Sequence, residues 1–292
     1  MSEYSDQIRR DFKAGDEARD AGLTTPNDVV RFDDIPYGDD PVWQVLDVYR
    51  PRKKEGKVLP VIVSVHGGGW VYGSKEVYQF YGMSLAQRGF AAVNFSYRLA
   101  PEHKFPAQLE DVNAVFQWVL DHAGEYGFDA KHVFAVGDSA GAHLLSLYGI
   151  LCTNPAYAAN FDFAPPKDFA PTALALNCGA YLVDARGEER TQALMGDLLP
   201  QGGKPEELRL ISPLEHLTDA FPPAFVMTAN RDFLRPQAPL LAAKLMEVGV
   251  PHVLRVYGDK GTPLHHVFHC DMRSVEGARC NDEECGWFKG FV

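Results

Sequence analysis

The sequence predicts an α/β protein in which a mostly parallel sheet of eight strands is covered by helices on both faces. Short apolar segments, such as 59–65 and 223–230, alternate with segments whose apolar residues follow helical spacing, such as 237–249. Strands that alternate with helices in this way favour a parallel sheet. In addition, two of the apolar segments run directly into glycine-rich turns at 66–70 and 137–141, which mark where those strands end.

The expected strands and helices follow one another along the whole chain. Strands are expected at VVRFDDIPY (29–37), WQVLDVYRP (43–51), LPVIVSV (59–65), AAVNFSYR (91–98), VFAV (133–136), TALALNCGA (172–180), PAFVMTAN (223–230) and HVLRVYG (252–258). Helices are expected at 1–25, 77–90, 105–127, 140–151, 191–199, 205–211, 237–249 and around 277–290. One domain, residues 1–292, accommodates all of them.

The turn at 137–141 reads GDSAG and fits the pattern G-x-S-x-G. In that pattern a serine occupies a strained turn between a strand and a helix, which exposes its hydroxyl. The flanking residues Gly137 and Gly141 let strand, turn and helix pass closely. The context is also right, because an apolar strand precedes the turn and a segment with leucines at helical spacing follows it. Ser139 is therefore the predicted nucleophile.

The bulk composition excludes several classes of partner. The chain of 292 residues has a net charge of −11 and a pI of about 5.3. Such a chain has no basic stripe for nucleic acid or for an anionic membrane surface. The polar N-terminus has no apolar core of a signal peptide, and no apolar run is long enough to cross a bilayer. We therefore expect a cytoplasmic protein without membrane insertion.

The cysteines do not form a pattern that predicts a metal site. There are five of them, at Cys152, Cys178, Cys270, Cys280 and Cys285, too few and too scattered for a disulfide scaffold. Three lie near histidines at the C-terminal end, but none forms a C-x-x-C pair. Free thiols and no bound metal are the expectation.

A serine nucleophile needs a general base, and the base needs a carboxylate that holds its tautomer. In folds with this turn, the acid and then the base follow the serine along the chain. Asp232 follows the strand 223–230, and the loop after the next strand holds His265, His266 and His269. Asp259 is the alternative acid, but it shares its loop with the candidate bases, which favours Asp232.

The strand 59–65 ends in His66 and three glycines, followed by Trp70. Consecutive glycines let backbone N–H groups turn toward a ligand, and an HGGG loop is a known source of oxyanion donors. Ala140, directly after the nucleophile, supplies another N–H group. Trp70 and Tyr72 are candidates for lining the substrate pocket, although aromatic residues near strand ends are more often part of the core.

Together these residues resemble the hormone-sensitive-lipase family of α/β-hydrolases, which includes bacterial esterases with an HGGG loop. The motifs that carry the resemblance are HGGGW (66–70), YRLAPEHKFPA (97–107), GDSAG (137–141), ANRDFLRPQA (229–238) and HHVF (265–268). The resemblance spans about residues 60–270 and is loosest in 150–222. It implies an α/β-hydrolase fold with a small helical cap, formed here by about 1–40 and 181–222.

The resemblance also implies roles for single residues. Ser139 resembles the nucleophile, Asp232 the triad acid, and His266 the base, because a small residue and then phenylalanine often follow the family's histidine. Gly68, Gly69 and Ala140 resemble the oxyanion donors, and His66 resembles a structural histidine.

The sequence departs from the family at two points near these residues. Ala229 and Asn230 stand shortly before the acid, where the family often has glycine. Val267 follows the base, where glycine is also common. These departures leave His265 and His269 open as alternative bases.

The sequence thus predicts a serine carboxylesterase that cleaves small, uncharged esters with short acyl chains through an acyl-enzyme, without a cofactor. An amidase, an arylformamidase or a sugar-ester deacetylase would use the same triad. A non-catalytic ligand-binding protein on this fold is a further alternative, which loss of a triad residue would favour. The resemblance also suggests a homodimer formed through an edge strand.

Overall fold

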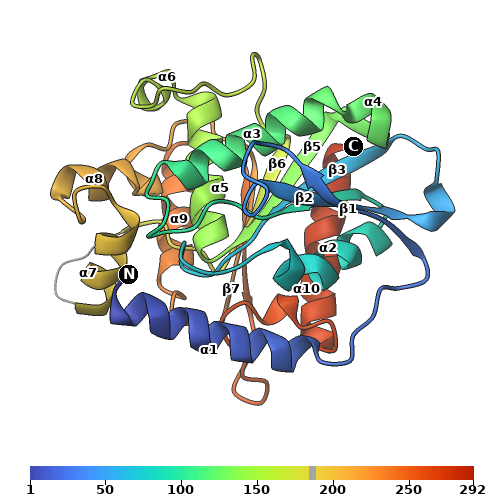
Figure 1. Cartoon of the computed structure of the whole chain (residues 1–292), viewed down its shortest axis with the longest axis horizontal. Coiled ribbons are helices and arrows are strands. Elements are labelled where there is room, and N and C mark those ends of the chain that lie inside the picture. Colours follow the sequence, from blue (N-terminus) through green and yellow to red (C-terminus); the bar gives the residue numbers. More distant parts are fainter. Residues whose placement is uncertain (184–188) are drawn as a thin grey trace.

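A computed structural model describes residues 1–183 and 189–292 of the chain (Figure 1). Residues 184–188 belong to the segment 181–222 that was expected to form part of the cap, and this portion of the expectation lies outside the described residues.

One sheet of eight strands forms the centre of the molecule. The strands are β1 (Val29–Pro36), β2 (Val45–Pro51), β3 (Leu59–Val65), β4 (Ala91–Phe95), β5 (Phe128–Asp138), β6 (Ala173–Asn177), β7 (Ala224–Ala229) and β8 (His252–Tyr257). Their order across the sheet is β1-β2-β4-β3-β5-β6-β7-β8. β2 pairs antiparallel with both β1 and β4, whereas β4, β3 and β5 to β8 are all parallel. The expected mostly parallel sheet is confirmed.

Helices cover the sheet and its edges. The α-helices are α1 (Glu3–Asp20), α2 (Lys75–Gln87), α3 (Ala107–Asp121), α4 (Ala123–Tyr126), α5 (Ala140–Thr153), α6 (Pro155–Ala158), α7 (Glu189–Leu198), α8 (Pro205–Leu210), α9 (Gln237–Glu247) and α10 (Val275–Phe288). Short 3-10 turns are η1 (Arg52–Lys54), η2 (Pro213–Glu215), η3 (Phe268–Cys270) and η4 (Lys289–Phe291).

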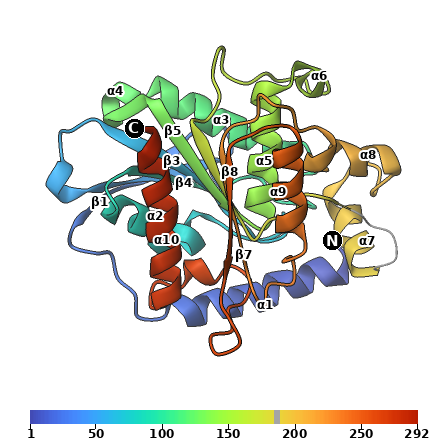
Figure 2. The ribbon, with the colours of Figure 1, turned by 180° about the vertical axis from the view of Figure 1, so that it is seen from behind.

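The alternation of side chains along β3 sorts the helices onto the two faces. Val61, Val63 and Val65 belong to one buried cluster, together with residues of α3, α5 and α9. Ile62, between them, belongs to a second cluster with residues of α2 and α10. Successive side chains of a strand point to opposite faces, so α3, α5 and α9 cover one face and α2 and α10 the other. Figure 2 shows α9 and α10 on opposite sides of β7 and β8.

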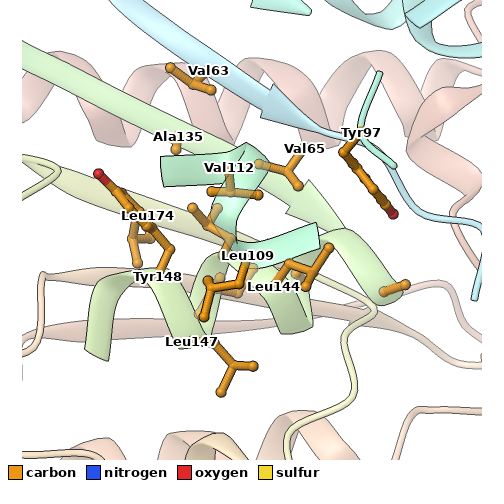
Figure 3. Close-up of a cluster of buried hydrophobic side chains, with 14 of the residues drawn as sticks. Val63, Val65, Tyr97, Leu109, Val112, Ala135, Leu144, Leu147, Tyr148 and Leu174 are labelled. Carbon is orange, nitrogen blue, oxygen red and sulfur yellow. The ribbon is translucent and has the colours of Figure 1, made fainter. Parts of the chain in front are cut away.

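Figure 3 shows the core on the α3–α5 face. Leu144 and Leu147 of α5 belong to one buried cluster with Leu109 and Val112 of α3, and all four are fully buried. Replacing a leucine buried in this way with alanine typically costs about 2–5 kcal/mol. This packed core therefore holds the ends of the strands rigidly in place. The loops of the candidate site extend from those ends.

Two expectations about the elements differ from the structure. The helix expected over 105–127 is two helices, because His122 leaves the helical path and its Nδ1 lies 2.9 Å from the carbonyl oxygen of Trp118. The expected N-terminal cap segment 1–40 also divides. Only α1 lies apart from the sheet, whereas residues 29–36 are β1, an edge strand of the sheet itself.

Since β3 to β8 are parallel, their carboxyl ends meet along one edge of the sheet. Both views show α1 running along this side of the molecule, with its first turn beside α7 (Figures 1 and 2). The candidate catalytic residues lie in the loops at this edge.

Candidate active site

The turn around Ser139 has the strained conformation that the GDSAG motif predicts. β5 ends at Asp138, α5 begins at Ala140, and Ser139 between them has φ 53° and ψ −117°. A non-glycine residue rarely adopts positive φ, and such strain is typical of functional sites. A Cβ on Gly141 would lie 2.0 Å from the carbonyl oxygen of Val65, so only glycine fits there. The half-buried Ser139 is thus presented at the edge of the sheet.

Asp232 and His266 come together from the loops after β7 and β8. Asp232 Oδ1 lies 2.7 Å from His266 Nδ1, and Oδ2 accepts a hydrogen bond of 2.8 Å from the hydroxyl of Thr228. Burial acts to raise the pKa of Asp232, but the hydrogen bond and charge of His266 hold it below its ordinary value. A neutral imidazole that donates from Nδ1 carries its lone pair on Nε2. This is the tautomer that a general base requires.

The alternative acid and bases occupy other positions. Asp259 accepts hydrogen bonds from the backbone N–H groups of Gly261 and Thr262, at 2.7 and 2.8 Å, and so stabilises its own loop. His265 is exposed. His269 is fully buried, and burial lowers its pKa to about 3. Of the three histidines, His266 is the one hydrogen-bonded to Asp232.

Val267, directly after His266, has φ 52° and ψ 31°, the left-handed conformation. A β-branched residue there is a genuine outlier. This explains physically why glycine is common at this position in the family that the sequence resembles. The sequence identified Val267 as a departure from the family, but it did not reveal the backbone strain at this residue.

The glycine loop after β3 turns sharply. Gly68 and Gly69 have φ 106° and 61°, and a Cβ on Gly68 would lie 2.1 Å from the carbonyl oxygen of Tyr72. The N–H group of Tyr72 donates a 3.0 Å hydrogen bond to the carbonyl of Gly68, which closes the turn. His66 is fully buried, stacks on Tyr97 at 4.0 Å, and has a pKa lowered by burial to about 4. It therefore supports the loop.

Trp70 and Tyr72 are both tied to other elements. Trp70 is 5% exposed, and its Nε1 donates a 3.1 Å hydrogen bond to Nδ1 of His143 on α5. Nε2 of His143 in turn lies 2.6 Å from the carbonyl oxygen of Ile211. The hydroxyl of Tyr72 donates a 2.9 Å hydrogen bond to Asp16 of α1. These contacts fix the glycine loop, and substrate contact by either residue stays a prediction.

Asp138 anchors the glycine loop to helix α2. Its Oδ2 accepts a 2.8 Å hydrogen bond from the hydroxyl of Tyr78 on α2, and a Cβ on Gly67 would lie 2.6 Å from the same oxygen. The carboxyl group thus packs directly beneath the glycine loop. Burial raises the pKa of Asp138 to about 7, while the hydrogen bond from Tyr78 acts in the opposite direction.

Sequence reasoning missed a second buried acid behind the nucleophile. The N–H group of Ser139 donates to the carbonyl of Asn177 at 2.9 Å. The side chain of Asn177 donates to Glu284 at 2.7 Å, and the hydroxyl of Tyr81 donates to Glu284 at 2.9 Å. Burial raises the pKa of Glu284 to about 7. No local motif marks Glu284, because it lies on α10, far along the chain.

The five cysteines are free, and four of them are buried. Within the described residues, Asp138, His269 and Cys270 lie close enough for one ion to contact all three, as do Cys178, Asp232 and His266. The second group contains the candidate acid and base. The expectation of no bound metal stays a prediction.

Comparisons with known proteins place this chain in a family. The BD-FAE family model matches residues 46–245. Esterase LipC of Mycobacterium tuberculosis is 32% identical over 210 residues, which cover 69% of this chain and 51% of that protein. Esterase LipQ of the same organism is 28% identical over 270 residues, covering 89% of this chain and 62% of that protein. The chain thus spans only about half to two thirds of the length of these relatives.

Two solved structures are similar over nearly the whole chain. Esterase B of Lactobacillus rhamnosis with a bound inhibitor has a TM-score of 0.89 at 25% identity, covering 99% of this chain and 97% of that one. The Pyrobaculum calidifontis esterase has a TM-score of 0.78 at 26% identity, covering 99% and 93%. These matches confirm the α/β-hydrolase fold and the resemblance to esterases. Across the described residues, no helix is long and apolar enough to span a membrane. Since the family model matches well over half of its 292 residues, the chain belongs to the BD-FAE family and has the α/β-hydrolase fold.

Proposed function

We propose that the protein is a serine carboxylesterase that hydrolyses small esters with short acyl chains. The observation that carries the proposal is the 2.7 Å contact between Asp232 and His266, at the same sheet edge as the strained turn of Ser139. A nucleophile, an acid and a base that follow one another in this chain order are the components of a catalytic triad.

In the acylation step, Ser139 Oγ attacks the ester carbonyl carbon while His266 Nε2 removes the hydroxyl proton. Asp232 stabilises the imidazolium that forms. The negative charge moves to the carbonyl oxygen, where the N–H groups of Gly68, Gly69 and Ala140 would hold it. The loop turn fixed by Trp70 and Asp138 prepares these donors in advance, which is how an oxyanion hole lowers the barrier.

The tetrahedral intermediate then collapses. The bond between carbon and alcohol oxygen breaks, and the alcohol leaves with the proton from His266. Water then attacks the carbonyl carbon of acyl-Ser139 while His266 takes one of its protons. The bond between that carbon and Ser139 Oγ breaks, His266 returns the proton to Oγ, and the carboxylic acid is released. Every group needed is supplied by the chain, so no cofactor takes part in the proposed reaction.

One of the similar solved structures supports the proposal that this enzyme accepts short acyl chains. Esterase B of Lactobacillus rhamnosis has been solved with a tributyrin phosphonate, whose acyl groups have four carbons; its TM-score is 0.89 at 25% identity, covering 100% of this chain and 96% of that one. For this chain, the homodimer and the cytoplasmic location remain parts of the proposal. Size-exclusion chromatography with light scattering would test the first.

The experiment that tests the function is hydrolysis of p-nitrophenyl acetate, butyrate, octanoate and palmitate by the wild type and by Ser139→Ala. Fast cleavage of the short esters, lost in the variant, is the expected result. Equal rates in both proteins would exclude Ser139 as the nucleophile. A matched pair of ester and anilide substrates distinguishes an esterase from an amidase or arylformamidase on the same triad.

A further inference from the structure

Helix α1 is fixed along the segment that follows the oxyanion glycines. Nε of Arg9 donates a 2.7 Å hydrogen bond to the carbonyl of Val71. The ring of Phe12 meets the ring of Tyr72 edge-on at 5.9 Å, and Asp16 accepts the hydrogen bond from the hydroxyl of Tyr72. Residues on three successive turns of α1 thus contact Val71 and Tyr72, and these contacts fix the position of α1 relative to the glycine loop.

Two side chains from separate elements close over Gly69. A Cβ on Gly69 would lie 3.8 Å from Cδ1 of Ile8 on α1 and 4.0 Å from Cδ2 of Leu194 on α7. These are ordinary van der Waals distances. Ile8 is only 7% exposed and is the one apolar residue of α1 that is buried. Ile8 and Leu194 together are called the roof below.

The two helices that carry the roof are joined to each other. The backbone N–H group and the hydroxyl of Ser2 both donate to Oδ2 of Asp197, at 2.8 and 2.7 Å. Ser2 is the N-cap of α1, and Asp197 lies in the last turn of α7. A doubly hydrogen-bonded carboxylate at 9% exposure holds the helices in one relative position. The roof is therefore a fixed boundary of the site.

We propose that Ile8 and Leu194 determine the acyl-chain length that the enzyme accepts, by limiting the space beside the oxyanion loop. The inference rests on the proposed function, and it gives a structural cause for the preference for short acyl chains. In the tetrahedral intermediate the leaving oxygen must reach His266, which is next to the ring of Phe233 at 4.3 Å. The alcohol group therefore extends toward His266 and Phe233. The acyl group is the substituent that remains beside Gly69, under the roof.

Ile8→Ala and Leu194→Ala test this directly, because each removes three carbons from the roof. A methylene in an apolar pocket changes kcat/KM by about 10-fold or more. We therefore expect the ratio of kcat/KM for p-nitrophenyl octanoate over butyrate to rise by about 10-fold in each variant. Ile8→Phe should do the reverse and lower the ratio of butyrate over acetate. Leu240→Ala on α9, where the leucine is 45% exposed, is the matched control and should leave both ratios unchanged.

The outcomes distinguish a failure of the role proposed for the roof from a failure of the proposed function. Acetate hydrolysis that Ser139→Ala abolishes supports the esterase, whatever the roof variants do. If the esterase holds but both alanine variants keep the wild-type ratio, the roof has no role in chain length. If their effect appears only when the alcohol is varied, in a series from methyl to benzyl acetate, the assignment to the acyl group is wrong. Should Ile8→Ala lose its circular dichroism signal, Ile8→Val removes a single carbon and must give a smaller shift in the same direction.

Discussion

Replacing Glu284 with glutamine should make the stability of the protein less sensitive to rising pH. Glu284 is fully buried on α10 and accepts hydrogen bonds from Tyr81 and Asn177. Burial raises its pKa to about 7, although the two hydrogen bonds act in the opposite direction. A glutamine has nearly the same shape and never carries a charge. The perturbation therefore removes the ionisation and leaves the packing in place.

The magnitude follows from the two pKa values. That of Glu284 is 4.5 in its ordinary state, which applies to the unfolded chain, and about 7 in the folded protein. Between these values the folded protein keeps a proton that the unfolded chain releases, so the free energy of unfolding falls as the pH rises. Above about pH 7 the loss is complete. One pKa unit corresponds to about 1.4 kcal/mol, so a difference of about 2.5 gives a loss of about 3 kcal/mol.

In Glu284→Gln the glutamine can form hydrogen bonds with the same two residues that Glu284 contacts. Its amide oxygen can accept from Tyr81. Its amide nitrogen can donate to Oδ1 of Asn177 after a half-turn of that side chain. In the present arrangement this buried oxygen has no hydrogen-bond partner among the described residues. The variant should therefore fold with little change at pH 5, where Glu284 is itself protonated.

Urea unfolding at pH 5 and pH 8 measures the effect. Relative to wild type, Glu284→Gln should be about 2.5 kcal/mol more stable at pH 8 than it is at pH 5, because part of the loss has already occurred at pH 5. Asp138 contributes a loss of the same sign, which the variant retains, so some pH dependence remains. Glu206→Gln, at a side chain 74% exposed on α8, serves as the control and should show no such difference. An equal stability difference at both pH values would refute the reasoning.

Three further predictions concern the site and its supports. Asp232→Asn keeps the shape of the acid but disturbs the tautomer of the base, so kcat for p-nitrophenyl butyrate should fall about 10⁴-fold; a loss below tenfold would argue against its role. Val267→Gly should change the free energy of unfolding by less than about 1 kcal/mol, because relief of left-handed strain offsets lost packing. As the control, Val63→Gly in the core should lower the free energy of unfolding by about 3 kcal/mol. If urea unfolding gave equal losses for Val267→Gly and Val63→Gly, this account of Val267 would be wrong. Gly141→Ala should lower the melting temperature sharply, because its Cβ would meet the carbonyl of Val65 at 2.0 Å. Gly286→Ala, with nothing within 4 Å, should instead stabilise α10 by about 1 kcal/mol, and a neutral Gly141→Ala would show that the turn can relax.

Local patterns were sufficient for most of the fold. All eight strands were expected, most of them as short apolar segments bounded by turns, and seven lie within three residues of the expected bounds. The exception is β5, which begins at Phe128, five residues before the expected start of that strand. The break in the helix 105–127 was not foreseen, because His122 is neither proline nor glycine and the break depends on how its side chain bonds to the backbone. The pairing of residues 29–36 with β2 was also beyond the pattern, since which edge a strand joins is decided by tertiary contacts.

For the candidate site, chain order and motif spacing were enough to propose Ser139, Asp232 and a group of three histidines. Chain order alone could not choose among His265, His266 and His269, because that choice depends on burial and on distance to Asp232. The family resemblance favoured His266, which is the histidine hydrogen-bonded to Asp232. The same limit applies to Ile8 and Leu194. Nothing in a polar N-terminal helix predicts that one isoleucine will face a glycine 61 positions away along the chain.

Backbone strain links the site loops to the buried network behind them. Six non-glycine residues in the described chain have positive φ, and four of these, Trp70, Ser139, Cys178 and Val267, lie in the loops after β3, β5, β6 and β8. Each such conformation costs about 1–3 kcal/mol and persists only where the surroundings enforce it. The enforcing contacts are found here, in the hydrogen bonds from Trp70 to His143 and from Ser139 through Asn177 to Glu284. The buried acids behind the site are therefore part of what holds the nucleophile turn in place. Glu284→Ala, which removes this support, should lower kcat more than it raises KM, whereas Glu284→Gln should restore kcat.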